Sequence, residues 1–333
     1  MKFATIQEGG AGRDGHAVLV SGDNTKVALL PDGLSTLQLI LDNWDKLLPQ
    51  LEEIDQKFSE GAWEDIRDSN EVKFLAPLPR AYAFLDGSAF IQHILLVRKA
   101  RGAEPPENLY TVPLMYQGAS DCFLAPKEDI PLIDEEYGLD FEAELAVVVG
   151  DVPQGINAGQ ADKYIRLFVI LNDISLRNLI PADIKTGFGF LHGKPNSSMA
   201  PFAVTVDELG DYWKDGRVHL DMVTHLNGKL FGHPNAGEMH FSFYELIAHA
   251  ARTRPLTAGT IIGSGTVSNK DPQVGSSCLA EKRMLEKIES GEITTPFLKS
   301  GDRIEIEMVK DNHSLFGKIS QKVRNINTDQ LPG

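Results

Sequence analysis

The sequence is poor in cysteine. Its 333 residues contain two, Cys122 and Cys278, which are far apart and form no Cys-x-x-Cys pair. A disulfide framework is therefore excluded, and we expect a reducing compartment. The surrounding segment, SDCFLAP, predicts that Cys122 is a packed thiol rather than a nucleophile.

Long apolar runs and an N-terminal hydrophobic signal core are also missing. We therefore expect no membrane-spanning segment and no secretory signal, and a cytoplasmic location. Dense Lys/Arg runs are absent as well, and the net charge is −15 at a sequence pI of about 5.0. This acidity argues against nucleic acid and anionic membrane surfaces as partners, and it is compatible with cation binding.

A fixed-period repeat, a low-complexity linker and a phosphate-binding glycine motif are not found either. The proline-containing stretch LAPLPRAYAF, residues 75–84, reads as a connector. Short apolar runs punctuated by glycine, proline and aspartate follow it, which is typical of β-strands with interspersed helices. We predict a small N-terminal α+β accessory domain at residues 1–74 and a β-rich α+β domain at residues 75–333.

The first of these units shows one clear helical pattern. Apolar residues recur at helical spacing from Leu37 to Leu51, after Ser35 and Thr36 as candidate N-caps. Pro49 should bend or end this helix. Nothing in residues 1–74 points to chemistry, so we expect a packing or docking unit.

Two acidic residues, Glu142 and Glu144, interrupt the apolar stretch LDFEAELAVVVG. The stretch reads as a β-strand, so both glutamates share one face, and the alternating apolar residues from Phe141 to Val147 face a core. Neighbouring carboxylates repel each other unless a cation lies between them, and Mg²⁺ and Ca²⁺ prefer carboxylate oxygens. The alternative is a solvated edge strand with both glutamates in water.

Further acidic candidates stand near other strand ends. Asp173 follows a buried-looking strand at residues 167–171, where functional groups often lie, although it could equally be a helix cap or a turn aspartate. Arg177 follows four residues later and could neutralise or orient a nearby carboxylate, or equally form a surface ion pair. Asp86 precedes His93 by seven residues. A histidine on an apolar helix face is more often a packed core residue than a base.

The segment IIGSGTVSNKDPQVGSSCLAEKR contains the last cluster. Its glycines, Gly263 and Gly265, together with Thr266, allow close approach of the backbone to a ligand, or else form a tight turn. Glu281 on its own reads as a surface helix charge.

Taken in order, several motifs resemble those of the fumarylacetoacetate hydrolase family. The resemblance covers residues 75–333 and includes FLDGSAFIQH, MYQGASD, LDFEAELAVVVGD, LNDISLRN, GFGFLHGKP, and GSGTVSNKD followed by CLAEKR. It implies a mixed β-sandwich or roll for the second domain and a homodimer formed through that domain.

The resemblance also implies roles for individual residues. A divalent metal, Mg²⁺ or Ca²⁺ with Mn²⁺ as a further candidate, would be bound by four carboxylates: Asp86, Glu142, Glu144 and Asp173. The predicted catalytic residues are His93, Glu281, Lys194 and Arg177. His93 would activate water and be held by Glu281, and the two cations would offset negative charge. The predicted substrate contacts are Tyr116, Gly265 and Thr266.

The implied reaction is hydrolysis of a carbon–carbon bond in a 1,3-dicarbonyl acid, through a metal-stabilised enolate. Fumarylacetoacetate, cleaved to fumarate and acetoacetate at the end of tyrosine breakdown, is the first candidate substrate. Alternatives on the same scaffold are acylpyruvate hydrolysis, oxaloacetate decarboxylation, and a hydratase or isomerase step. A non-catalytic metal-binding scaffold is the alternative from another class.

Two positions depart from the fumarylacetoacetase pattern. Ile180 and Ile184 stand near the places where that pattern has a glutamine and a tyrosine facing the substrate. The spacing to Lys194 also differs by one residue. The contacts to the far end of the substrate therefore stay open.

Overall fold

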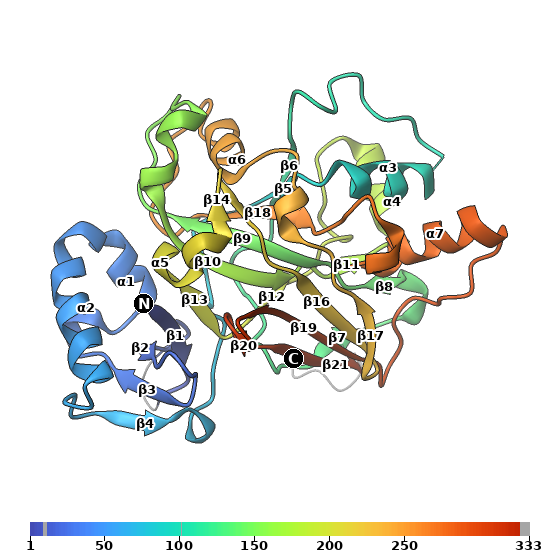
Figure 1. Ribbon diagram of the computed structural model, residues 1–333. Coiled ribbons are helices and arrows are strands. Elements are labelled where there is room, and N and C mark those ends of the chain that lie inside the picture. Colours follow the sequence, from blue (N-terminus) through green and yellow to red (C-terminus); the bar gives the residue numbers. More distant parts are fainter. Residues whose placement is uncertain (9–11, 101, 327–333) are drawn as a thin grey trace.

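The computed structural model describes residues 1–8, 12–100 and 102–326, and its main feature is one large mixed sheet (Figure 1). Its strands, in spatial order, are β4 (Ile66–Asp68), β3 (Lys26–Leu29), β2 (His16–Val20), β1 (Lys2–Ile6), β13 (Phe202–Val204), β10 (Ile165–Asn172), β9 (Ala143–Val149), β18 (Ile261–Thr266), β5 (Phe84–Ser88) and β6 (Leu114–Gly118). A short strand, β12 (Ser198–Met199), pairs with β10.

A second sheet packs against the middle of the first. Its strands are β17 (Lys229–Gly232), β16 (Met222–Leu226), β19 (Arg303–Lys310), β21 (Ile319–Asn325) and β7 (Ile130–Leu132), with β20 (His313–Ser314) on β19. The remaining strands form two short pairs, β8 (Leu139–Asp140) with β11 (Ser175–Leu176), and β14 (Trp213–Lys214) with β15 (Arg217–Val218).

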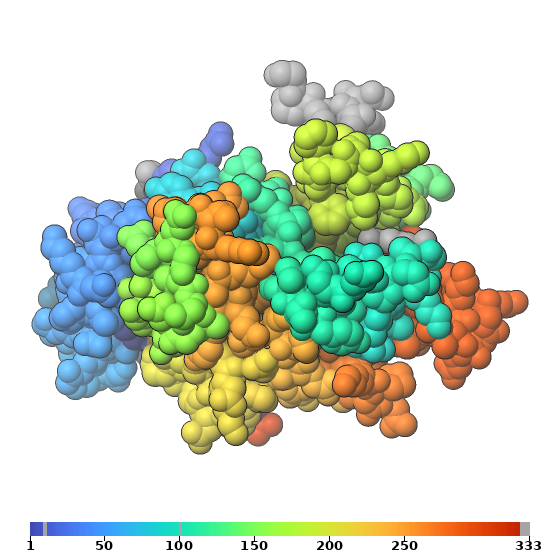
Figure 2. Space-filling model, turned by 90° about the horizontal axis from the view of Figure 1, so that it is seen from above, coloured from blue at the N-terminus to red at the C-terminus, as the bar shows by residue number. Residues whose placement is uncertain are grey.

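The helices lie around these sheets. They are α1 (Leu37–Asp42), α2 (Trp44–Ser59), α3 (Ile91–Ala100), α4 (Ile180–Thr186), α5 (Val206–Leu209), α6 (Phe243–Ala250) and α7 (Leu279–Ser290). Seen from above, the segments of α3, α4 and α7 gather at the end of the molecule opposite the N-terminal residues (Figure 2). Within the described residues, no helix combines the length and apolar character that crossing a membrane requires.

The β-rich α+β architecture predicted from the sequence is confirmed, and the alternation of strand residues explains its core. The odd-numbered residues of β9 pack in a core shared with the second sheet, where Ile304 and Ile306 of β19 also lie. Ala146 and Val148, on the opposite face of β9, pack in a core shared with α1 and α2. Both faces of β9 are therefore buried, and the alternative of a solvated edge strand is wrong.

The N-terminal strands continue the large sheet rather than forming a sheet of their own, because β1 pairs with β13. The domain boundary at residue 74 stays a prediction. Thr36 caps α1, as expected, by accepting a hydrogen bond from the backbone of Leu39. The helical segment breaks at Asn43, however, and α2 does not end at Pro49. The buried face of α2 outweighs the one hydrogen bond that Pro49 cannot make.

Candidate metal centre and active site

Three of the predicted metal-binding carboxylates come from one face of the central strands. Asp86 shares the face of Phe84 on β5, and Glu144 shares the face of Ala146 on β9. Asp173 follows β10 directly. The three side chains are buried, and one oxygen of each lies within 4.8 Å of the others. Strand alternation thus brings three distant carboxylates to one place.

Two glycines of a neighbouring strand make room for this cluster. Between β9 and β5 runs β18, in which Gly263 pairs with Asp86. A Cβ atom at Gly263 would lie 2.2 Å from Oδ1 of Asp86. Gly265, at φ +76°, donates its backbone N–H to the same oxygen at 3.2 Å, and a Cβ there would lie 2.5 Å from the carbonyl oxygen of Gly87. The two glycines therefore allow Asp86 and the backbone of β5 to lie close to β18, and they do not form a tight turn.

The cluster fits a hard divalent cation. Both oxygens of Glu144 are buried without a hydrogen-bond partner among the described residues. Burial, together with the charges of Asp86 and Asp173, raises the pKa of Glu144 well above its usual range. Burial and Asp173 raise the pKa of Asp86 in the same way. Carboxylates placed like this need protons or a cation, and oxygen ligands suit Mg²⁺, Ca²⁺ or Mn²⁺.

Glu142, the fourth predicted ligand, lies beside this cluster and contacts two cations. Its carboxylate accepts hydrogen bonds from Nη2 of Arg177 at 2.5 Å and from Nζ of Lys194 at 2.6 Å. Burial alone would raise the pKa of Glu142, but Arg177 and Lys194 outweigh burial and hold that pKa well below its usual range. Glu142 is therefore ionised and paired, in contrast to Glu144.

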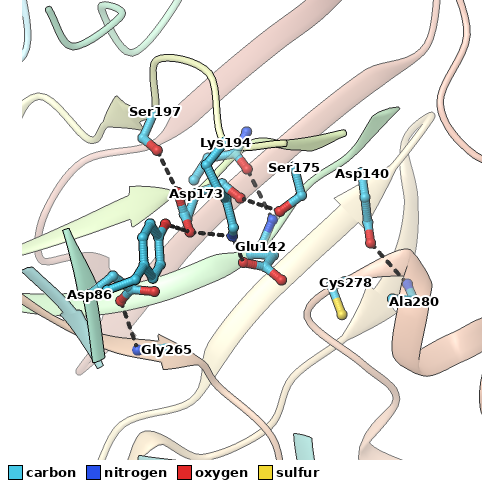
Figure 3. Close-up of polar contacts among 12 residues, drawn as sticks. Asp86, Asp140, Glu142, Asp173, Ser175, Lys194, Ser197, Gly265, Cys278 and Ala280 are labelled. Atoms are coloured by element: carbon cyan, nitrogen blue, oxygen red, sulfur yellow. Dashed lines mark hydrogen bonds and ion pairs between the residues drawn. The ribbon is translucent and has the colours of Figure 1, made fainter. Parts of the chain in front are cut away.

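Lys194 links Glu142 to the cluster. Its Nζ also donates to Oδ2 of Asp173 at 2.5 Å, so the ammonium lies between the two carboxylates (Figure 3). Burial lowers the pKa of Lys194, but Asp173 and Glu142 more than reverse this effect and raise it above its usual value. Lys194 thus keeps its positive charge inside the protein.

Aromatic and hydroxyl groups complete the surroundings of Asp173. Tyr116, on β6, donates its hydroxyl to Oδ2 of Asp173 at 2.7 Å, and Ser197 donates to Oδ1 at 2.7 Å. Burial and the Asp173 charge raise the pKa of Tyr116 well above its usual value, so the phenol stays neutral. The ring of Tyr116 packs edge-on against Phe190 at 4.9 Å.

A histidine–glutamate pair stands next to the carboxylates. Nδ1 of His93, on α3, lies 2.7 Å from Oε1 of Glu281, on α7. Nε2 of the same imidazole lies 3.9 Å from Oε1 of Glu142. Glu281 is 2% exposed, so reading it as a surface helix charge is wrong. The thiol of Cys278 lies within 4.8 Å of this pair.

The structure also places the other residues that the sequence singled out. Thr266 pairs with Glu144 across β18 and β9, and its buried hydroxyl has no partner among the described residues. The two positions that depart from the fumarylacetoacetase pattern are isoleucines and offer no polar side chain. Ile180 is buried against Gly193, and Ile184 is exposed. Cys122 is exposed, contrary to expectation, because its neighbour Phe123 is the residue that enters the core.

Sequence reasoning missed three residues around the site. Asp140 binds Arg177, Ser197 binds Asp173, and Asp183 accepts the backbone N–H groups of Leu191 and Gly193 just before Lys194. Asp140 stands two positions before Glu142, in the same alternating pattern, and that was the one available signal. Ser197 and Asp183 carry no comparable signal.

A separate cavity of about 1170 Å³ lies between the N-terminal segment and residues 121–129. None of the predicted site residues lines it. Its lining carries no buried, unpartnered polar group among the described residues, in contrast to the carboxylate cluster. The chemistry of the side chains therefore favours the cluster as the functional site.

Curated proteins of similar sequence include two oxaloacetate tautomerases. The oxaloacetate tautomerase Fahd2a, mitochondrial, of Rattus norvegicus is 26% identical over 243 residues, which are 72% of this chain and 67% of that protein. The oxaloacetate tautomerase YisK of Bacillus subtilis is 29% identical over 241 residues, 71% of this chain and 70% of that protein.

Solved structures share the fold. Maleylpyruvate hydrolase from Sphingobium sp. SYK-6, in complex with manganese (II) ion and pyruvate, superposes with a TM-score of 0.66 at 15% identity. The 5-carboxymethyl-2-hydroxymuconate delta-isomerase from Mycobacterium smegmatis does so with a TM-score of 0.63 at 16% identity. Each comparison covers 98% of this chain and 100% of the other.

Family models match nearly the whole length. Residues 1–80 match the fumarylacetoacetase N-terminal domain 2, and residues 83–324 match the fumarylacetoacetate hydrolase C-terminal model. Together with the carboxylate cluster and the histidine–glutamate pair, these matches establish that the chain belongs to the fumarylacetoacetate hydrolase family.

Proposed function

We propose that this protein is a divalent-metal-dependent enzyme that hydrolyses a carbon–carbon bond in a small 1,3-dicarbonyl acid. The observation that carries the proposal is the orientation of His93. Its Nδ1 faces Glu281 at 2.7 Å, and its Nε2 lies 3.9 Å from Glu142, at the edge of the carboxylate cluster. An imidazole held in this way suits a general base acting on a water molecule.

The metal would be held by Asp86, Glu144 and Asp173, with Glu142 beside them. When bound, a divalent cation supplies positive charge that offsets negative charge on a substrate oxygen. The all-oxygen donor set supports Mg²⁺, Ca²⁺ or Mn²⁺, and the related maleylpyruvate hydrolase structure contains manganese.

Proton transfer would begin at His93. The hydrogen bond from Nδ1–H to Glu281 leaves Nε2 free to accept a proton from water. The hydroxyl group then bonds to the substrate carbonyl carbon, and the adjacent carbon–carbon bond breaks. The electron pair of that bond stays with the departing carbon, which leaves as an enolate. The enolate then takes up the proton from His93.

The two buried cations would act on the charge that develops. Lys194 and Arg177 already neutralise Glu142, and their N–H groups face the same space as the carboxylates. Preorganised donors of this kind stabilise an oxyanion more strongly than water does. The neutral hydroxyl of Tyr116, the backbone of Gly265 and the unpartnered hydroxyl of Thr266 would contact the substrate.

Fumarylacetoacetate and short acylpyruvates both belong to the proposed substrate class. Neither Ile180 nor Ile184 offers a polar contact to the far end of a substrate, which supports a short or apolar tail. The deciding experiment is a spectrophotometric assay of both compounds with Mg²⁺, Ca²⁺, Mn²⁺ or a chelator. Metal-dependent cleavage of either supports the proposal, and metal binding without cleavage of any member of the class rejects it.

A second candidate is proton transfer on oxaloacetate without cleavage of a carbon–carbon bond. The names of the two curated relatives favour it, and the pair of His93 and Glu281 could move a proton between carbon and oxygen. Oxaloacetate enriched in the enol form would be mixed with the protein, and enol absorbance and pyruvate would be followed together. Accelerated loss of the enol without pyruvate would identify a tautomerase, whereas pyruvate would identify a decarboxylase.

A further inference from the structure

We propose that Asp140 is a positioning residue that holds Glu281 and Arg177 in place for catalysis. This inference rests on the proposed function, because it assigns Asp140 to the same reaction. Asp140 itself does not face the carboxylate cluster. It acts through the two residues that contact His93 and Glu142.

The carboxylate of Asp140 is fully buried and accepts three hydrogen bonds. The donors are Nε of Arg177 at 2.7 Å and the backbone N–H groups of Leu279 at 2.7 Å and Ala280 at 3.0 Å. Figure 3 shows the Asp140 side chain directed at the start of the α7 segment. A buried carboxylate with this many donors, one of them a guanidinium group, forms strong hydrogen bonds and leaves little freedom to its partners.

The first turn of α7 depends on Asp140 because its local cap is weak. The N-cap residue is Cys278, whose thiol accepts from the backbone of Glu281 at 3.5 Å. Sulfur is a poor acceptor, and the N–H groups at a helix start need partners. The negative charge of Asp140 also lies favourably at the positive end of the helix dipole. Strand β8 therefore fixes where α7 begins.

The position of Glu281 follows from that anchor. Glu281 is the third residue of α7, one position after Ala280, so movement of the first turn moves its carboxylate away from His93. The same Asp140 binds one nitrogen of Arg177, while another nitrogen of Arg177 binds Glu142. One carboxylate thus sets the histidine–glutamate pair and the cation beside it.

The test compares Asp140→Asn with Glu286→Gln in the full-length protein with Mg²⁺. Glu286, near the far end of α7, also accepts two backbone N–H groups, from Thr294 and Thr295, but it does not contact the site. Asparagine keeps the shape of Asp140, but its amide NH₂ group is a donor and cannot accept hydrogen bonds from the N–H groups that face it. We expect kcat to fall about 100-fold in Asp140→Asn with KM within about threefold, and no change in Glu286→Gln.

A second readout does not depend on turnover. Protein labelled with ¹⁵N-histidine, with His93 assigned through His93→Gln, should show the proton on Nδ1 in the unsubstituted protein and in Glu286→Gln. Asp140→Asn should show a mixture of tautomers at His93. An unchanged His93 tautomer in a folded Asp140→Asn protein would overturn the proposal. If no substrate is turned over at all, the proposed reaction fails, and this spectrum still decides the role of Asp140.

Hydrogen exchange in the unsubstituted protein covers the case in which Asp140→Asn does not fold. The amides of Leu279 and Ala280 should exchange as slowly as those of the central strand β9. If these two amides exchanged as fast as first-turn amides that have no hydrogen-bond acceptor, Asp140 would not hold α7, and the inference would be rejected.

Discussion

The imidazole of His93 and the carboxylate of Glu281 lie 2.7 Å apart, although 188 positions separate them in the chain. The contact joins α3 to α7, two helices that pack against each other. Its geometry leaves Nε2 of His93 directed toward the carboxylates, which is why the pair carries the proposed chemistry.

The first prediction concerns His93 itself. His93→Gln should reduce hydrolysis by at least about 100-fold, because it removes the group that takes a proton from water. The affinity for Mn²⁺, measured calorimetrically, should stay within about threefold, since His93 is not among the clustered carboxylates. His313→Gln, at the exposed first position of β20, is the matched control. Normal turnover in folded His93→Gln would remove the base from the mechanism.

The second prediction concerns Glu144 and the metal. Its two oxygens lack hydrogen-bond donors among the described residues, and burial beside Asp86 raises the pKa of Glu144. Glu144→Gln should therefore raise the melting temperature of the metal-free protein, by removing like-charge repulsion. It should also weaken Mn²⁺ binding by about tenfold or more.

Thermal unfolding with and without Mn²⁺ measures both effects. At a metal concentration 100 times Kd, binding should stabilise the unsubstituted protein by about 2.7 kcal/mol, and Glu144→Gln by clearly less. The exposed Glu52→Gln serves as control. Equal Mn²⁺ stabilisation in all three proteins would reject the proposed metal site.

The third prediction concerns Lys194. Lys194→Gln should lower kcat by about 100-fold, because it removes a fixed charge next to the reacting oxygens. The pKa of Lys194 is raised by Asp173 and Glu142 despite burial, so its deprotonation should not limit the rate at mildly alkaline pH. Steady-state kinetics against pH tests both points. Lys185→Gln, on the exposed side of α4, should behave like the unsubstituted protein, and a similar loss there would point to a general effect of charge.

The fourth prediction is a pH dependence of stability at the end of α7. Burial tends to raise the pKa of Glu286, but hydrogen bonds from Thr295 and Thr294 prevail and lower it from 4.5 to about 2. A carboxylate whose pKa is lower in the folded than in the unfolded protein stabilises the fold at pH values above the unfolded pKa. This stabilisation is lost as the pH falls through the folded-state pKa of about 2.

Glu286→Gln should therefore cost about 1–2 kcal/mol in urea unfolding at pH 7. The difference from the unsubstituted protein should shrink between pH 4.5 and about 2. A difference that stays constant over this range would show that the charge of Glu286 is not involved.

Strand alternation made much of the site predictable. The pattern around Glu142 and Glu144 predicted one carboxylate face and one core face, and the apolar residues from Phe141 to Val147 do enter the core between the sheets. The same alternation could not separate a central strand from an edge strand, because that depends on partners far away in the chain. It also could not show that Glu142 contacts cations while Glu144 does not.

Other features depend on tertiary packing and carry little local signal. Glu281 looks like any helix charge until α7 packs against α3, and Asp140 looks like a third member of the acidic pattern until Arg177 and α7 reach it. Pro49 was expected to bend or end a helix, but burial of one face of α2 keeps the helix intact beyond that residue. The predicted homodimer stays a prediction.

The position of β18 between β9 and β5 has a consequence for synthesis on the ribosome. A nascent chain that has passed Asp173 holds all the acidic residues of the cluster, but Gly263 and Thr266 have not yet been made. The sheet cannot close between β9 and β5 until β18 inserts, and Glu281 follows later still. We therefore expect the carboxylate cluster and the histidine–glutamate pair to be assembled only late in translation, after most of the chain has left the ribosome.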